Sequence, residues 1–103
     1  MIVRIWRTRL DESRAGEYER FAHERSMPMF QRRQGCLGVL FARTHNGRAV
    51  ITLWEDETAV ERLEADSEYR STVEAIAAAG FLRPPQVVEL LDAGSGWLAR
   101  SSW

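Results

Sequence analysis

The fold of this 103-residue chain is decided by the stretch CLGVLFARTHNGRAVITLWE, residues 36–55. Its two ends, 36–44 and 49–55, are rich in β-branched and aromatic residues, which is typical of strands. Asn46-Gly47 between them is the dipeptide most typical of a type I′ hairpin turn, so we predict an antiparallel hairpin with these two turn residues. In that register the paired residues are Arg43 and Val50, Phe41 and Thr52, and Val39 and Trp54.

Both faces of this hairpin are apolar. One face carries the pairs just named, and the opposite face carries Leu40, Ala42, Ile51, Leu53 and Cys36. A sheet with one face in water alternates apolar and polar residues, so both faces of this sheet should be covered. Helices can cover one face, and a second copy of the same sheet is the simplest cover for the other. We therefore predict a homodimer with an interface of roughly 1,500 Å² or more in total.

The segments on either side of the hairpin complete a βαββαβ order. Ile2–Leu10 alternates as a strand, with Ile2, Arg4, Trp6, Thr8 and Leu10 on one face. A helical pattern begins near Asp11 or Ser13 and ends at Gly35, and Pro28 predicts a kink or break near Met27. A second pattern begins at Asp56, restarts at Asp66 or Ser67 and ends at Gly80, before a strand at Gln86–Leu91.

This order predicts the ferredoxin-like α+β fold, with helices on one face of a four-stranded antiparallel sheet. We expect residues 1–93 to form this single domain and residues 94–103 to form a flexible C-terminal tail after Gly94-Ser95-Gly96. The tail carries Trp97 and Trp103, which we expect to dock on the partner subunit.

Charge and cysteine content narrow the function classes. The net charge is −1, which gives no general attraction to nucleic acid or an anionic membrane, so neither is expected as a partner. Arg4, Arg7 and Arg9 are interpreted as the rim of an interface or as partners of glutamates.

The single cysteine excludes an intramolecular disulfide and fits a reducing cytoplasm. All 14 basic residues are arginine, which suggests GC-rich bacterial coding.

Familiar cofactor motifs are missing from the sequence. His23, His45 and Cys36 do not have metal-ligand spacing, and we interpret both histidines as solvated. Neither a phosphate-binding glycine loop nor a nucleophile elbow occurs. We therefore expect no metal, haem or nucleotide cofactor.

Several stretches resemble the antibiotic biosynthesis monooxygenase family. They are VITLWEDETA at 50–59, DSEYR at 66–70, the opening MIVRIWR and QGCLG at 34–38. The resemblance covers residues 1–92 and implies a dimeric α+β barrel, in which two sheets pack face to face with helices outside. Characterised members oxidise polycyclic phenols or quinols with O₂ and no cofactor, in a pocket between sheet and helices.

The resemblance carries over to the site only in part. The family's pocket tryptophan matches Trp54, whereas its Asn, Tyr and Arg stand where this chain has Val50, Val60 and Glu74. The haem-degrading branch does not match, because its pocket Trp falls at Leu63 and its haem-ligating His at about Val73.

We predict a ligand pocket between the sheet and the helices, with Trp54 in its wall and Arg70 holding an anionic oxygen. These two are the candidate catalytic residues. The candidate substrate-binding residues are Val39, Phe41, Val50 and Tyr69. In the alternative interpretation Trp54 is buried core and Arg70 pairs with Glu74 at i+4.

Two functions remain open at this stage. One is a cofactor-independent monooxygenase, an oxidoreductase acting with O₂ on an aromatic phenol, quinol or polyketide-type substrate. The other is a non-catalytic dimeric barrel that binds a small aromatic molecule. Whether the chain is an enzyme is therefore uncertain from the sequence, with the resemblance favouring the oxygenase.

Overall fold

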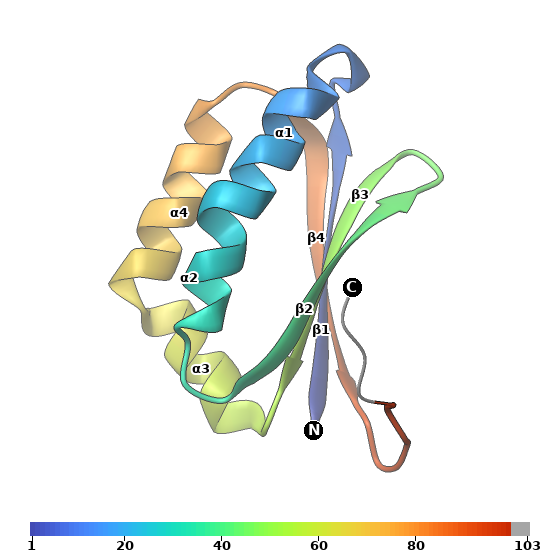
Figure 1. Ribbon diagram of the computed structural model, residues 1–103, viewed down its shortest axis with the longest axis vertical. Coiled ribbons are helices and arrows are strands. Elements are labelled where there is room, and N and C mark those ends of the chain that lie inside the picture. The colour runs from blue at the N-terminus through green and yellow to red at the C-terminus, as the bar shows by residue number, and fades with distance from the viewer. Residues whose placement is uncertain (100–103) are drawn as a thin grey trace.

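The computed structural model describes residues 1–99 and consists of one antiparallel sheet with its helices on one side (Figure 1). The strands are β1 (Ile2–Leu10), β2 (Cys36–Thr44), β3 (Gly47–Trp54) and β4 (Leu82–Asp92). Their order in the sheet is β2-β3-β1-β4, and every neighbouring pair is antiparallel. This is the ferredoxin-like arrangement, so the predicted fold class is confirmed.

The first helical segment changes its winding before Pro28. A short 3₁₀ turn, Glu12–Arg14, leads into α1 (Ala15–Phe21), a π-helical turn at Ala22–Ser26 and α2 (Met27–Gln31). Proline has no N–H to donate inside a helix, and the wider turn ends directly before Met27. The irregularity predicted near Met27 therefore takes the form of a π-helical turn in a continuous helix.

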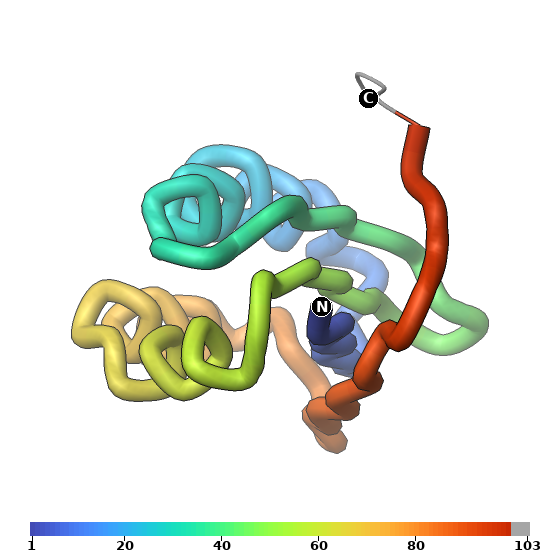
Figure 2. The backbone as a smooth tube through the Cα atoms, turned by 90° about the horizontal axis from the view of Figure 1, so that it is seen from below, coloured from blue at the N-terminus to red at the C-terminus, as the bar shows by residue number. Residues whose placement is uncertain are grey.

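The second helical segment is divided by an aspartate that caps its second part. Asp56 caps α3 (Glu57–Ala65) by accepting a hydrogen bond from the Ala59 N–H at 2.9 Å. Asp66 caps α4 (Ser67–Ala78) through the Tyr69 N–H, also at 2.9 Å. Figure 2 shows both helical segments on one side of the sheet, while the chain after β4 runs on the other side. The caps fix which residues of α4 turn toward the sheet.

The hairpin register differs from the prediction by two residues. Thr44 pairs with Gly47, so His45 and Asn46 are the turn residues, and neither has a positive φ. Gly47 is needed for a different reason, because a Cβ there would overlap the carbonyl oxygen of Thr8 on β1. The type I′ turn was therefore wrong, but a shift of two residues leaves the side chains of residues 38–44 and 49–54 on their predicted faces.

A β-bulge at Leu37 puts Cys36 on the other face of the sheet from the one predicted. Cys36 pairs with Trp54 and Gly38 with Leu53, so Leu37 is an extra residue on β2. Because the bulge breaks the alternation, Cys36 packs against the core under the helices. It had been predicted on the opposite face with Leu40.

The last strand is longer than predicted and tolerates its prolines because it lies at an edge. It spans Leu82–Asp92, whereas only Gln86–Leu91 was expected, and it contains Pro84 and Pro85. An edge strand needs donors on only one side, and the register with β1 shifts between Arg7 and Arg9, opposite these prolines.

The sheet face without helices carries apolar side chains that reach solvent. Leu40, Val87 and Leu91 are each between 44% and 49% exposed, and Val3, Ile5 and Leu53 lie between them in register. Trp97, beyond β4, is 85% exposed; Trp103 lies outside the described residues. Within residues 1–99, no helix is long and apolar enough to cross a membrane.

Candidate functional site

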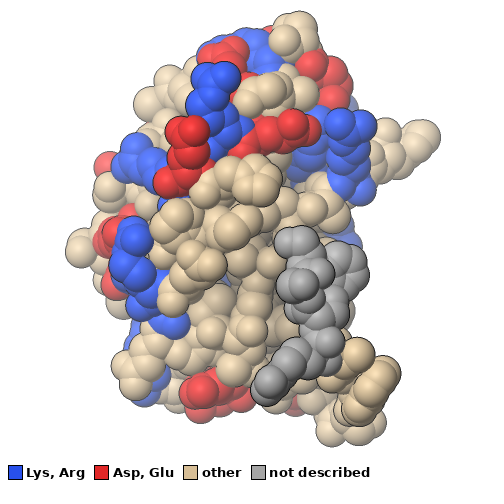
Figure 3. Space-filling model, in the orientation of Figure 1, with Lys and Arg blue, Asp and Glu red and all other residues tan. Residues whose placement is uncertain are grey.

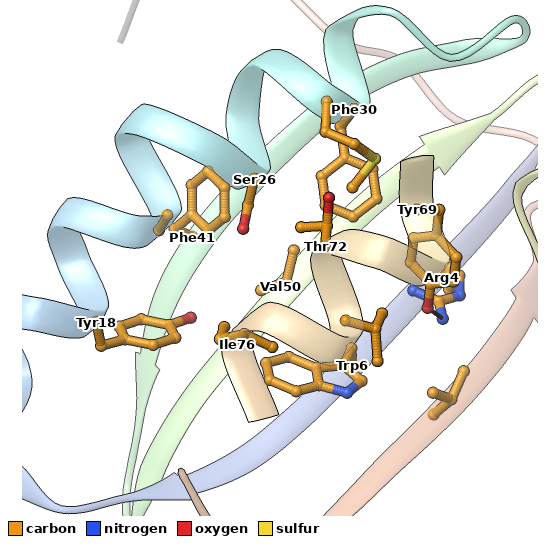
Figure 4. A pocket seen from close by; sticks show the side chains of 14 residues that line it. Arg4, Trp6, Tyr18, Ser26, Phe30, Phe41, Val50, Tyr69, Thr72 and Ile76 are labelled. Atoms are coloured by element: carbon orange, nitrogen blue, oxygen red, sulfur yellow. Dashed lines mark hydrogen bonds between the residues drawn. The ribbon is translucent and has the colours of Figure 1, made fainter. Parts of the chain in front are cut away.

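A cavity of about 140 Å³ lies between the sheet and the helices (Figure 4). It separates the two parts of the core, one built around Trp54 and the other around Tyr18 and Phe81. Its lining is mostly apolar and aromatic. The lining residues are Arg4, Trp6, Tyr18, Ala22, Ser26, Met29, Phe30, Phe41, Val50, Tyr69, Thr72, Val73, Ile76 and Val88.

Arg4 is the single charged residue in this lining. It projects from β1 and is 4% exposed, yet within residues 1–99 it makes no ion pair with a carboxylate. Its Nη2 donates to the Tyr69 hydroxyl at 2.7 Å, and its Nε has no partner in that range. A buried guanidinium without a carboxylate is costly, so its position suits an anionic ligand oxygen.

Tyr69 adds a second donor beside Arg4. Its backbone N–H is bound by Asp66 at the start of α4, which fixes the first turn from which the ring projects. The guanidinium carbon of Arg4 lies 5.5 Å from the centroid of the Tyr69 ring. Because the Tyr69 oxygen accepts from Arg4, its own hydrogen is free to be donated. Two donors therefore converge at this end of the cavity.

Tyr18 contributes a buried phenolic hydroxyl to the cavity wall, which also includes Ser26 and Thr72. It lies on α1, is 3% exposed, and its hydroxyl has no partner within residues 1–99. Burial raises the pKa of Tyr18 to about 12, so the hydroxyl is protonated at neutral pH. Its ring packs edge-on against Phe81 with centroids 6.1 Å apart.

The space between these polar ends is bounded by flat or branched apolar side chains. Figure 4 shows Trp6, Val50 and Ile76 between Tyr18 on one side and Arg4 on the other. Phe30 lies near the Arg4 end and stacks at a tilt against Tyr69, with ring centroids 6.5 Å apart. Such walls suit a planar aromatic ligand with few polar atoms.

Three of the four predicted substrate-binding residues line the cavity: Phe41, Val50 and Tyr69. Val39 is not in the lining and packs against the core around Trp54 instead. In the observed register Val39 pairs with Thr52, close to the fully buried part of the sheet.

The placement of Trp54 in the cavity wall was wrong. The side chain is 0% exposed, and its Nε1 donates to Thr52 Oγ1 at 2.7 Å. It packs edge-on against Phe30 with ring centroids 6.4 Å apart, so Phe30 stands between it and the cavity. At the end of β3, Ala59 and Leu63 of α3 belong to the same buried core as Trp54.

Arg70 also lies away from the cavity. It is exposed, and its Nε donates to the carbonyl oxygen of Glu64 at 3.0 Å. Successive residues of a helix are about 100° apart, so Tyr69 faces the sheet and Arg70 does not. The alternative pairing with Glu74 is not formed either in the described part of the chain. Here Arg70 supports the junction of α3 and α4.

The polar residues that the sequence did not single out are Arg4 and Tyr18. Arg4 had been interpreted with Arg7 and Arg9 as the rim of an interface or as a partner of glutamates, although it shares its strand face with Ile2 and Trp6. A charged residue at an inward position of an alternating strand is uncommon. That position was the signal that could have identified Arg4.

Several other arginines of the described chain pair with carboxylates. Arg14 pairs with Glu17 and Arg32 with Glu68 at the surface, and the buried Arg48 pairs with Glu12. Figure 3 shows positive and negative side chains interspersed around an uncharged central area on the face in view. Within residues 1–99, no group of three or more His, Cys, Asp or Glu side chains could hold a metal ion.

No protein-family model matches the sequence, and no curated protein matches it. Several solved structures share its fold. A candidate antibiotic biosynthesis monooxygenase from Caulobacter crescentus matches with a TM-score of 0.77 at 18% identity, over 91% of this chain and 90% of that one. SnoaB, a cofactor-independent oxygenase from Streptomyces nogalater, matches with 0.74 at 20% identity, over 92% and 94%.

A monooxygenase from Streptomyces coelicolor, solved with the ligand nanaomycin D, matches with a TM-score of 0.76 at 18% identity. The match covers 96% of this chain and 92% of that chain. At these identities the similarity establishes a common fold. The subunit fold implied by the sequence resemblance is therefore confirmed, and the dimer stays a prediction.

Proposed function

We propose that this chain is a cofactor-independent oxygenase that acts on an aromatic phenol or quinol in the cavity between sheet and helices. The observation that carries the proposal is Arg4, a buried cation in an apolar cavity with no carboxylate partner in residues 1–99. Its fold is that of SnoaB, a cofactor-independent oxygenase. We further propose that it works in the cytoplasm, where its one cysteine stays reduced.

In the proposed reaction the substrate supplies the electrons. Its hydroxyl loses a proton to water, and the resulting oxyanion binds Arg4 and the Tyr69 hydroxyl, which favours the deprotonated form. The electron-rich ring carbon then reduces O₂ and forms a carbon–oxygen bond. One oxygen atom remains as a carbonyl, and the other leaves as water with two substrate hydrogens. The apolar walls hold the ring and exclude water.

The test is oxygen uptake with anthrone, whose oxidation to anthraquinone consumes one O₂ and releases one water. We expect the protein, in buffer with a metal chelator, to raise the rate above spontaneous autoxidation and to saturate with anthrone. Heat-denatured protein at the same concentration is the control. A rate equal to autoxidation, together with no anthrone binding under nitrogen, contradicts the proposal.

A non-catalytic binding protein is the second candidate. The observation in its favour is that Val50, Val60 and Glu74 stand where the resembled family has polar pocket residues. The same experiment separates the two functions. Saturable binding under nitrogen without any oxygen uptake in air supports the binding protein.

We propose that a second copy of the chain covers the helix-free face of the sheet. Leu40, Val87 and Leu91 are about half exposed there, and burying such a patch on itself gives a two-fold interface. We expect sedimentation to show a dimer at micromolar concentration, and Leu40→Arg to shift it to monomer. Thr58→Arg, on the exposed side of α3, is the matched control and should remain dimeric. A stable wild-type monomer contradicts this prediction.

A further inference from the structure

The cavity has a second polar group that the proposed reaction does not use, the hydroxyl of Tyr18. It is buried and has no partner within residues 1–99. Leaving a buried hydroxyl unpaired costs free energy, so such groups in a cavity wall call for an explanation. The other fully buried polar atom in this lining without a partner in residues 1–99, Arg4 Nε, is the one assigned to the substrate oxyanion.

We propose that the cavity recognises two oxygen atoms of its substrate, an ionised hydroxyl at Arg4 and Tyr69 and an uncharged carbonyl at Tyr18. The inference rests on the proposed function and narrows its substrate class. Figure 4 shows the Tyr18 hydroxyl turned toward the interior and Arg4 at the opposite end, with Trp6, Val50 and Ile76 between them. A planar ring system lying along these apolar side chains brings one oxygen to each end.

The ring of Tyr18 is fixed by its neighbours. Phe81 packs edge-on against it, and the guanidinium carbon of Arg48 lies 5.9 Å from its centroid. Arg48 is itself held by Glu12, through two contacts of 3.1 Å, and by the carbonyl oxygen of Gly47 at 2.9 Å. A ring held on two sides presents its hydroxyl in one direction, which is what recognition of a single ligand atom requires.

The hydroxyl of Tyr18 is suited to donate to a neutral acceptor. It keeps its proton at neutral pH because burial disfavours the phenolate. A phenolic O–H is a better donor than acceptor, since the ring draws electron density from its oxygen. No cation other than Arg48 lies against Tyr18 in the described chain, and Arg48 is already paired. An anionic group at this end would lack a free countercharge, so a carbonyl fits better.

The substrate class that follows is a fused-ring aromatic with an ionisable hydroxyl at one end and a carbonyl oxygen at the other. The matched probes are 6-hydroxy-2-naphthaldehyde, which has both groups on opposite ends of two rings, and 2-naphthol, which has the hydroxyl alone. Calorimetry under nitrogen measures binding without any oxidation. For each ligand, the affinity for wild type is compared with the affinity for Tyr18→Phe, so the different acidities of the two ligands cancel.

We expect Tyr18→Phe to weaken binding of the hydroxyaldehyde about tenfold, the usual effect of losing one hydrogen bond in a site. Binding of 2-naphthol should change by less than about twofold. The melting temperature of free Tyr18→Phe should equal or exceed that of wild type, because the lost hydroxyl has no protein partner. Equal weakening of both ligands, or no weakening of the aldehyde, overturns the two-oxygen inference and leaves the proposed function standing.

The infrared carbonyl stretch of the bound aldehyde gives a second measurement, made on wild type and Tyr18→Phe at the same pH. A lower frequency in wild type supports a hydrogen bond from Tyr18, and equal frequencies in the two proteins overturn it. If wild type binds neither naphthalene ligand, the proposed function fails and the inference fails with it. The two failures are therefore distinguishable.

Discussion

Trp54→Ala is expected to lower the free energy of unfolding by about 3–5 kcal/mol, the usual cost of emptying a large core site. The side chain is 0% exposed, and its removal also leaves Thr52 Oγ1 without the 2.7 Å hydrogen bond from the indole. Phe30 would lose its edge-on partner and with it part of the cavity wall. Urea unfolding followed by circular dichroism measures the change.

Trp6→Ala is the matched comparison for Trp54→Ala. It removes the same atoms, but from the cavity wall, where the indole is only partly buried. Trp6→Ala should therefore lower the free energy of unfolding by clearly less than Trp54→Ala, and it should weaken ligand binding by more. The opposite pattern, in which Trp54→Ala folds normally and loses ligand binding, would restore the sequence-based placement of Trp54 in the wall.

Arg4→Met is expected to weaken binding of an aromatic phenolate by about 30-fold or more, the usual range for truncating one partner of a buried charge pair. The same substitution should stabilise the ligand-free protein, because it replaces an unpaired buried charge with an apolar chain of similar length. Calorimetry with 2-naphthol above its pKa and a thermal melt measure the two effects. Weaker ligand binding together with a more stable ligand-free protein identifies Arg4 as a binding residue, because replacing a structural residue would lower the stability.

Two other arginines serve as comparisons for Arg4→Met. Arg20→Met changes an exposed residue of α1 outside the cavity lining and should leave both binding and stability near wild type. Arg70→Met tests the residue that the sequence favoured. If Arg70→Met abolishes phenolate binding while Arg4→Met retains it, the assignment made from the structure is wrong.

The fold was predictable because it depends on patterns that repeat over many residues. Alternation along Ile2–Leu10 and in the hairpin specified the strands and their faces, and the aspartates at 56 and 66 marked the helix starts. The two-residue error in the hairpin register did not change which side chains share a face, because the side-chain direction along a strand repeats every two residues. The bulge at Leu37 was not predictable, because one extra residue leaves little trace in such a pattern.

The site was less predictable because its residues come from separate parts of the chain. Tyr69 and Arg70 are adjacent in sequence, and only the cap at Asp66 and the packing of α4 decide which of them faces the sheet. Trp54 carried the strongest local signal, but its neighbours in space, Phe30 and Leu63, bury it completely. Burial of a particular ring depends on contacts that no short stretch encodes.

The prolines of β4 have a consequence for how copies of this protein can aggregate. An edge strand normally offers its free N–H and C=O groups to any other extended chain, which is how sheets grow into open-ended assemblies. Pro84 and Pro85 have no N–H, and the irregular pairing opposite them distorts this end of the ladder. Edge-to-edge growth along the first part of β4 is therefore discouraged by backbone chemistry, independently of surface charge.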